Sequence, residues 1–187
     1  MDGTIRVLGI SGSLRAASWN TRTLHAAREL APPGVEVEVF GRMREIPVYD
    51  DDLRASQGHP PAVEALRGEI RAADAVLICS PEYNYSVPGM LKNALDWVSR
   101  PPDQPFDGKP VAIAGAATGL LGTARMQYDL RKIFVFLNAH VLNKPEVMIA
   151  QAPSRFDAEG RLTDETTRGM VAAQLAALRD WTLRLRR

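Results

Sequence analysis

The sequence predicts an α/β protein in which helices cover both faces of a parallel β-sheet. Five short apolar runs, rich in β-branched residues, alternate with five segments whose apolar residues recur at helical spacing. The central run, residues 75–79 (AVLIC), is apolar throughout, as expected for a parallel strand that is covered on both faces. A chain of 187 residues with 45% apolar residues can bury a core of its own, and we expect residues 1–187 to form one domain.

The first half of the chain contains two strands and two helices. Residues 5–10 (IRVLGI) form an apolar run that ends at Ser-Gly-Ser, which predicts a buried strand. A helix is expected over residues 21–31, where apolar side chains share one helical face and Pro-Pro-Gly follows. Residues 35–39 (VEVEV) alternate apolar and acidic, which is typical of a strand near a sheet edge. Residues 41–60 contain proline, glycine and a run of three aspartates, so we expect an irregular, solvated loop there. An apolar stripe then predicts a helix at 61–73.

The second half continues the alternation after the central strand. Helical stripes are expected at 91–98 and 126–137, on either side of a strand in 110–115. A fifth strand is expected within 141–149, starting late because of the proline in that segment. A last helix is expected over 171–185.

The strand order follows from the way in which parallel strands connect. Right-handed crossovers leave few orders, and the flavodoxin-like order 2-1-3-4-5 is a common one. We therefore expect a flavodoxin-like three-layer sandwich. Ligands of such sheets bind beyond the carboxyl ends of the strands, where the order switches. The loops 11–20, 80–89 and 115–123 leave those ends.

The first of these loops predicts an anion site. Ser13, Ser18 and Thr21 carry hydroxyls between a strand and a helix start, where backbone N–H groups and the helix dipole favour negative charge. The loop lacks the lysine of a nucleoside triphosphate site and the glycine pattern of a dinucleotide site. It fits a monophosphate that is held and not transferred. In the plainer alternative, Ser18 or Asn20 caps the helix and Arg15 is solvated.

The other two loops suit a flat ligand. Residues 81–89 (PEYNYSVPG) offer two tyrosines and an asparagine, which provide stacking surface and hydrogen-bonding groups. Residues 115–122 (GAATGLLG) are small enough for the backbone to approach a ring closely, although a plain glycine-rich connection would look the same. A phosphate at one loop and a planar ring between the others describe a mononucleotide, and FMN fits best.

Three segments carry a resemblance to a known family. GSLRAASWN (12–20), PEYNYSVPGMLKNALDWVSR (81–100) and GLLGTARMQYDLRKIF (119–134) resemble the NADPH-dependent FMN reductase family, including its quinone and chromate reductase members. Ala16 and Ala17 stand where members often have lysine and glycine. The resemblance implies FMN as cofactor, NADPH or NADH as co-substrate, and homodimers or homotetramers with FMN sites near the subunit contacts.

The resemblance also implies roles for individual residues. The first loop would hold the FMN phosphate, residues 81–85 would border the isoalloxazine mostly through main-chain contacts, and residues 117–118 would close its pyrimidine side. The residues expected to bind FMN are Ser13, Arg15, Ser18, Asn20, Thr21, Pro81, Glu82, Tyr83, Asn84, Tyr85, Ala117 and Thr118. Arg125 and Tyr128 lie one helical turn apart after the third loop, and we expect them at a subunit boundary.

The expected function is electron transfer from NAD(P)H through FMN to quinones or similar acceptors, such as chromate or azo compounds, by a ping-pong mechanism. The flavin N5 carries the chemistry, so we expect no catalytic side chain and no metal ligands. Two alternatives stay open: a flavin reductase that releases reduced FMN, and a non-enzymatic FMN-binding electron carrier or regulatory module. A net charge of +1 disfavours a carrier, since such carriers are usually strongly acidic.

Composition limits the partners and the location. The 23 basic and 22 acidic residues nearly cancel, so we expect neither nucleic acid nor a membrane surface as partner, only small-molecule electron acceptors. Cys79 is the sole cysteine, which excludes an intrachain disulfide. The start of the chain resembles no signal peptide, and no apolar run is long enough to span a membrane. We expect a cytoplasmic protein.

Overall fold

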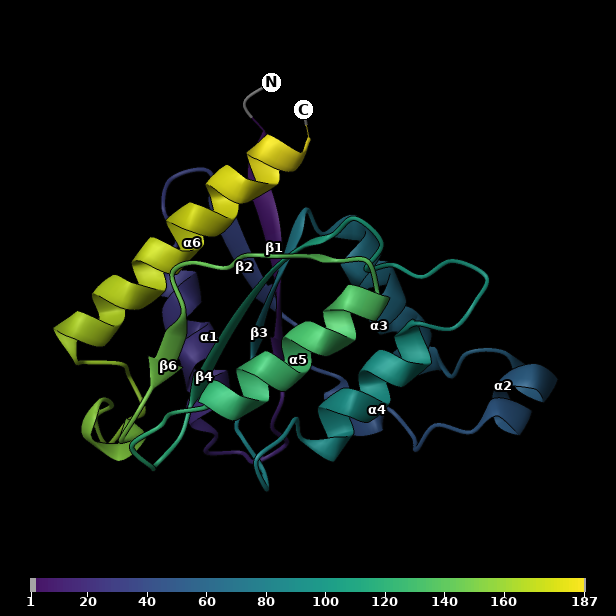
Figure 1. Cartoon of the computed structure of the whole chain (residues 1–187), viewed down its shortest axis with the longest axis horizontal. Helices are drawn as coiled ribbons and strands as arrows, with labels where there is room; N and C mark the ends of the chain where they lie inside the picture. The colour runs from purple at the N-terminus through teal and green to yellow at the C-terminus, as the bar shows by residue number, and fades with distance from the viewer. Residues whose placement is uncertain (1–2, 187) are drawn as a thin grey trace.

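The computed structural model, which describes residues 3–186, is built on one parallel sheet. Its strands are β1 (Ile5–Ser11), β2 (Val35–Val39), β3 (Ala75–Cys79), β4 (Pro110–Ala116), β5 (His140–Val141) and β6 (Val147–Ile149). They lie in the order β2-β1-β3-β4-β5, and β6 also pairs with β4 (Figure 1). All the pairs are parallel, so the predicted flavodoxin-like order is confirmed.

Helices form a layer on each face of the sheet. They are α1 (Trp19–Glu29), α2 (Asp51–Gln57), α3 (Pro61–Ala72), α4 (Gly89–Val98), α5 (Ala124–Phe136) and α6 (Glu165–Leu185), with 3-10 turns η1 (Met43–Glu45) and η2 (Ala152–Ser154). The helices α1 and α6 lie on one face and α3, α4 and α5 on the other, while α2 lies away from the sheet (Figure 1). Among residues 3–186, no helix has both the length and the apolar composition needed to cross a membrane.

The alternation of side chains along β3 explains why this strand is apolar throughout. Val76 and Ile78 pack into the core beneath α3, α4 and α5. Leu77 and Cys79 pack into the core beneath α1 and α6. None of these side chains is more than 2% exposed. Both faces of the strand are therefore covered, as the sequence predicts for a central strand.

The segment expected to contain the fifth strand is bordered by two short strands. β5 pairs with Pro110 and Val111 at the start of β4, whereas β6 pairs with the last three residues of β4. The segment between them contains Pro145, which has no backbone N–H to donate to a neighbouring strand. The sheet is therefore interrupted there. The strand that the sequence predicts to start late within 141–149 is β6, and the short strand β5 before it was not predicted.

The segment 41–60 is more regular than the sequence indicated. It contains η1 and the short helix α2, which begins directly after Asp50. The Asp50 carboxylate accepts hydrogen bonds from the backbone N–H groups of Asp52 (2.9 Å) and Leu53 (3.4 Å). Acidic side chains at this position cap a helix and interact favourably with the positive end of its dipole. The expectation of a solvated loop is thus corrected: the aspartates are exposed, but they start a helix.

The carboxyl ends of β1, β3 and β4 meet at one edge of the sheet. Ser11 lies opposite Cys79, which in turn lies opposite Ala114. The chain reverses its direction across the sheet between β1 and β3, which is where ligands of such folds bind. The three loops that the sequence singles out therefore converge on this edge.

Candidate functional site

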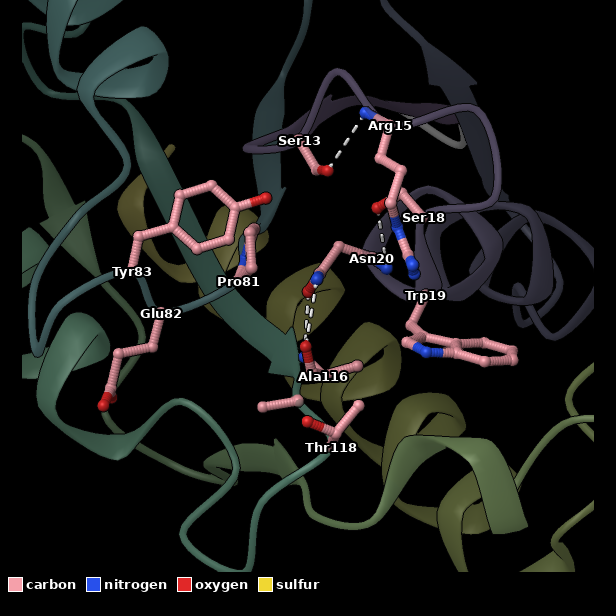
Figure 2. Close-up of a pocket in the computed structure, with 11 residues that line it drawn as sticks. Ser13, Arg15, Ser18, Trp19, Asn20, Pro81, Glu82, Tyr83, Ala116 and Thr118 are labelled. Carbon is pink, nitrogen blue, oxygen red and sulfur yellow. Dashed lines mark hydrogen bonds between the residues drawn. The ribbon is translucent and has the colours of Figure 1, made fainter.

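A cavity of about 290 Å³ opens between the three loops. It is lined by Ser13, Arg15, Ser18, Trp19, Asn20, Pro81, Glu82, Tyr83, Ala116, Ala117 and Thr118. Figure 2 shows the residues of the first loop on one side, Pro81 and Tyr83 on another, and Ala116 and Thr118 below them. Each loop thus supplies one wall, as the strand order requires.

The first loop gathers donors at one end of the cavity. Ser18 caps α1, because its Oγ accepts hydrogen bonds from the N–H groups of Asn20 (3.2 Å) and Thr21 (3.4 Å). Its hydroxyl hydrogen is left to donate to a ligand. The Oγ of Ser13 accepts from the N–H of Arg15 at 3.3 Å, and its hydroxyl has the same freedom. A guanidinium, two hydroxyls and the positive end of an 11-residue helix make this end suitable for an anion.

Asn20 connects the first loop to the third. Its Nδ2 donates to the Ala116 carbonyl at 3.0 Å, and its Oδ1 accepts from the Ala116 N–H at 2.8 Å (Figure 2). The side chain is only 3% exposed. The resemblance assigned Asn20 to the phosphate, but the structure commits both ends of its amide to the end of β4. At most its second N–H would be left for a phosphate.

A tight turn shapes the second loop. The N–H of Tyr83 donates to the Ser86 carbonyl at 3.1 Å, and the N–H of Ser86 donates back to Tyr83 at 3.0 Å. Asn84 and Tyr85 between them have positive φ angles of 49° and 70°, the pattern of a type I′ turn. Tyr83 therefore borders the cavity, while Asn84 and Tyr85 form the tip of the turn outside it.

Glu82 anchors this loop to α5. Its side chain points away from the cavity (Figure 2) and is 5% exposed. The carboxylate accepts from the backbone N–H groups of Arg125 (3.1 Å) and Met126 (3.2 Å) and forms an ion pair with the Arg125 guanidinium. Hydrogen bonding to Glu82 raises the pKa of Arg125 above its ordinary value. The same guanidinium lies 3.5 Å from the ring centroid of Tyr85, so Arg125 holds both the residue before the turn and the tip of the turn.

The third loop is fixed by the backbone that follows β6. The N–H of Ala117 donates to Ile149 at 3.0 Å, and its carbonyl accepts from Ala152 at 3.0 Å. Among the described residues no group accepts the backbone N–H of Thr118. This N–H is therefore available to a ligand in the cavity.

The structure brings most of the predicted site residues together. Thr21, Asn84 and Tyr85 do not line the cavity: the hydroxyl of Thr21 lies 2.8 Å from that of Ser11, and the other two occupy the turn tip. The sequence reasoning missed Trp19 and Ala116, which do line it. An aromatic residue between Ser18 and Asn20 was a usable signal, whereas Ala116 contributes no distinctive side chain.

The residues present fit FMN. Hydroxyls and a guanidinium at one end match a phosphate, and peptide groups and an aromatic side chain at the other match a planar ring with polar edges. Among residues 3–186, no group of three or more histidine, cysteine or acidic side chains is placed to hold a metal ion. Burial raises the pKa of Cys79 far above its ordinary value, so this neighbouring thiol stays protonated.

The fold and cavity define a flavodoxin-like protein with a site for a mononucleotide. The model of the NADPH-dependent FMN reductase family matches residues 5–154. The chain is 56% identical over the full length of both proteins to an NAD(P)H-dependent FMN reductase of Pseudomonas aeruginosa, and 44% identical, again over both full lengths, to a quinone reductase of Escherichia coli. The solved structure of FerB, a flavoenzyme NAD(P)H:(acceptor) oxidoreductase of Paracoccus denitrificans, superposes with a TM-score of 0.86 at 35% identity, covering 96% of this chain and 98% of FerB.

The chain therefore belongs to the NADPH-dependent FMN reductase family. This confirms the resemblance drawn from the three sequence segments. It also confirms the predictions of an FMN-dependent NAD(P)H oxidoreductase, with FMN as cofactor and a reduced nicotinamide as co-substrate. The acceptors are small molecules, as the quinone reductase relatives imply.

Proposed function

We propose that this protein passes two electrons from NADPH or NADH through a retained FMN to quinones, with chromate and azo compounds as further acceptors. The observation that carries the proposal is the cavity that three loops enclose at the carboxyl ends of β1, β3 and β4, in a chain of this family. When bound, FMN supplies the redox chemistry by accepting a hydride equivalent and giving up two electrons.

The residues of the chain would bind and orient the cofactor. Ser13, Arg15 and Ser18 would hold its phosphate by charge-assisted hydrogen bonds. The peptide groups around Tyr83 and the free N–H of Thr118 would face the ring edges, where donors favour the reduced, more negative form. Glu82 and Asn20 would act as positioning residues, since they fasten the second and third loops to α5 and α1.

Steady-state kinetics test the order of the two half-reactions. Because one cavity serves both substrates, the nicotinamide must leave before the acceptor enters, and we expect parallel double-reciprocal lines when NADPH is varied at several fixed quinone concentrations. Intersecting lines would show that both substrates bind together and would contradict the proposed mechanism.

Retention of FMN separates this proposal from a flavin reductase that releases its product. Glu82 and Arg125 hold the turn at Tyr83–Ser86 in place. This turn forms one wall of the cavity, and a rigid wall favours retention of FMN. The protein should stay yellow through gel filtration after reduction and reoxidation. Loss of flavin to the small-molecule fraction on reduction would instead support the releasing reductase.

We further propose a homodimer or homotetramer, folded as one domain per chain. Tyr128, Val135 and Phe136 on α5 are 53%, 81% and 81% exposed, and exposed apolar patches of this kind mark contact surfaces. Arg125 binds Glu82 of its own chain, so the interface would rest on these apolar side chains and less on Arg125 itself. We keep the cytoplasm as the proposed location, because reduced nicotinamides are produced and used inside cells.

A further inference from the structure

A second cavity, of about 320 Å³, lies on the other side of the first loop. It separates α1 from the hairpin in which Phe156 pairs with Leu162. Its lining residues are Ala16, Thr21, Arg22, His25, Ala26, Glu29, Glu159, Gly160, Arg161 and Leu162. The proposed FMN site uses none of these side chains.

The Arg22 guanidinium is held in a defined position at this cavity. Its central carbon lies 4.7 Å from the ring centroid of Trp19, a cation–π contact. It also packs against Gly160, where an added Cβ would lie only 2.3 Å from the Arg22 Nε and 2.4 Å from its Cζ. Gly160 has a φ of +84°, so the hairpin turn and the close approach to Arg22 require glycine at the same position.

Arg22 has no acceptor within the part of the chain that the structure describes. No hydrogen bond or ion pair is formed by its guanidinium, whereas Arg161 across the cavity is bound to Asp157 at 2.7 Å. A planar guanidinium that is already oriented and has free N–H groups is well suited to bind a phosphate in bidentate fashion. Little side-chain entropy would be lost on binding.

The other charges at the cavity favour a phosphate attached to a sugar. His25 lies one turn after Arg22 on α1 and adds a second donor. Of the two carboxylates, Glu159 is paired with Arg161 at 3.3 Å, and Glu29 is free to accept hydrogen bonds from hydroxyl or amino groups. A phosphorylated ribose carries groups of both kinds.

The two cavities are neighbours along the chain. Thr21 and Arg22 line the second cavity, and Ser18, Trp19 and Asn20, which directly precede them, line the first. The shared stretch is the end of the first cavity that we assign to the FMN phosphate. A dinucleotide whose nicotinamide lies on the flavin ring would extend past this end to bring its adenosine end to Arg22 in the second cavity. NADPH differs from NADH only in the phosphate on the adenosine 2′-oxygen.

We propose that the second cavity binds the 2′-phosphate of NADPH through Arg22 and so sets a preference for NADPH over NADH. This inference rests on the proposed function. It assigns to the chain a specificity-determining residue that lies outside the FMN cavity.

Substitution of Arg22 tests the proposal through kinetics. Arg22→Met should raise the KM for NADPH by about tenfold or more, the loss expected for a hydrogen-bonded charge pair, and leave kcat unchanged. The KM for NADH should stay the same. Arg22→Lys keeps the charge but loses the planar fork, so its KM for NADPH should lie between those of the wild type and Arg22→Met. Arg28→Met, on the same helix but outside the cavity, is the matched control for the loss of one positive charge.

Calorimetry with the FMN-loaded protein tests the site without turnover. We expect 2′-AMP to bind more tightly than 5′-AMP, and this difference to vanish in Arg22→Met while FMN content and melting temperature are kept. Equal binding of 2′-AMP, 5′-AMP and inorganic phosphate, no wild-type preference for NADPH, or an equal loss with NADPH and NADH would overturn the proposal. Absence of turnover with either nucleotide would contradict the proposed function instead, and the 2′-AMP result would still decide this inference.

Discussion

At the scale of single residues, Gly115 shows how the absence of a side chain shapes the cavity. A Cβ at this position would lie 2.1 Å from the Thr123 Oγ1 and 2.5 Å from the Ser80 carbonyl oxygen. Neither group can move aside easily. Thr123 is buried and accepts a hydrogen bond from Gln127, and the Ser80 carbonyl is part of the main chain at the start of the second loop. The close approach of β4 to both groups therefore requires glycine.

Gly115→Ala should lower the free energy of unfolding by about 1–3 kcal/mol, the usual cost of overpacking, and weaken FMN binding. Gly119→Ala in the same loop is the control, since nothing lies within 4 Å of a Cβ there. Urea unfolding and FMN titration of both variants measure the two effects. Equal stability of the two variants would show that the loop adjusts freely.

Arg15 carries the second prediction at this scale. If its guanidinium holds the FMN phosphate, Arg15→Met should weaken FMN binding by about tenfold or more and leave riboflavin binding unchanged, because riboflavin has no phosphate. Fluorescence titration of the apoprotein measures both affinities. Arg42→Met, which loses an exposed charge paired with Glu45, should change neither. An equal loss for both flavins would mean that Arg15 only supports the loop.

The identity of most site residues could be predicted from the sequence, but their contacts could not. Hydroxyls and a guanidinium at a helix start indicate an anion site whatever the exact geometry. The role of Asn20 depends on Ala116, which is 96 residues away, and no local pattern reveals such a partner. The tyrosine pair looked like one ring-binding surface, yet the type I′ turn places only Tyr83 at the cavity.

At the scale of elements, the long helix α6 is stabilised by a side-chain cap at its N-terminus. The Asp164 carboxylate caps it by accepting from the Thr167 hydroxyl at 2.5 Å and from the Thr167 N–H at 2.9 Å. These hydrogen bonds, with Arg155 nearby, hold the pKa of Asp164 below its ordinary value of 3.8. The charged form of the Asp164 carboxylate is thus stabilised more in the folded protein than in the unfolded chain.

Because the pKa of Asp164 is lowered in the folded protein, this carboxylate makes the free energy of unfolding decrease on acidification. The contribution of Asp164 is present above the ordinary pKa and is lost as the pH falls through the lower value of the folded state. Asp164→Asn, which cannot ionise, should therefore show a flatter decline of unfolding free energy on acidification below about pH 4. Asp180→Asn on the same helix is the control. Urea unfolding at several pH values measures the slope, and identical slopes for wild type and Asp164→Asn would contradict this account.

The elements that the sequence located best are those with strong periodicity. The strands β1, β2, β3 and β4 were identified by apolar runs or by strict alternation, and the large helices by apolar stripes. β6 was located as a strand that starts late because of Pro145, whereas β5 was missed because its two residues are too few to form a recognisable apolar run. α2 was missed because it buries no residue, so its sequence carries no apolar stripe.

At the scale of the whole molecule, the exposed apolar face of α5 bears on assembly. Tyr128 and Val135 are seven residues apart and lie on the same side of this helix. Val135→Glu should shift the protein to a smaller species in gel filtration with light scattering, because a charge at an apolar contact is costly to bury. Val48→Glu, at an 83% exposed position before α2, is the matched control. No change of mass with Val135→Glu would place the interface elsewhere.

The parallel sheet explains why residues from three distant segments form one cavity. Each loop leaves the carboxyl end of a strand, and β1, β3 and β4 end at the same edge. This arrangement followed from the sequence because handedness and strand order leave few alternatives. The central claim is that a chain built in this way keeps FMN in that cavity and exchanges electrons through it.

The most direct test is the visible absorption spectrum of the purified protein, recorded before and after anaerobic NADPH and again after a quinone is added. We expect a flavin spectrum that bleaches with NADPH and returns with the quinone, at constant flavin content. A protein that is colourless and does not bind added FMN, or a flavin that NADPH fails to reduce, would contradict the account.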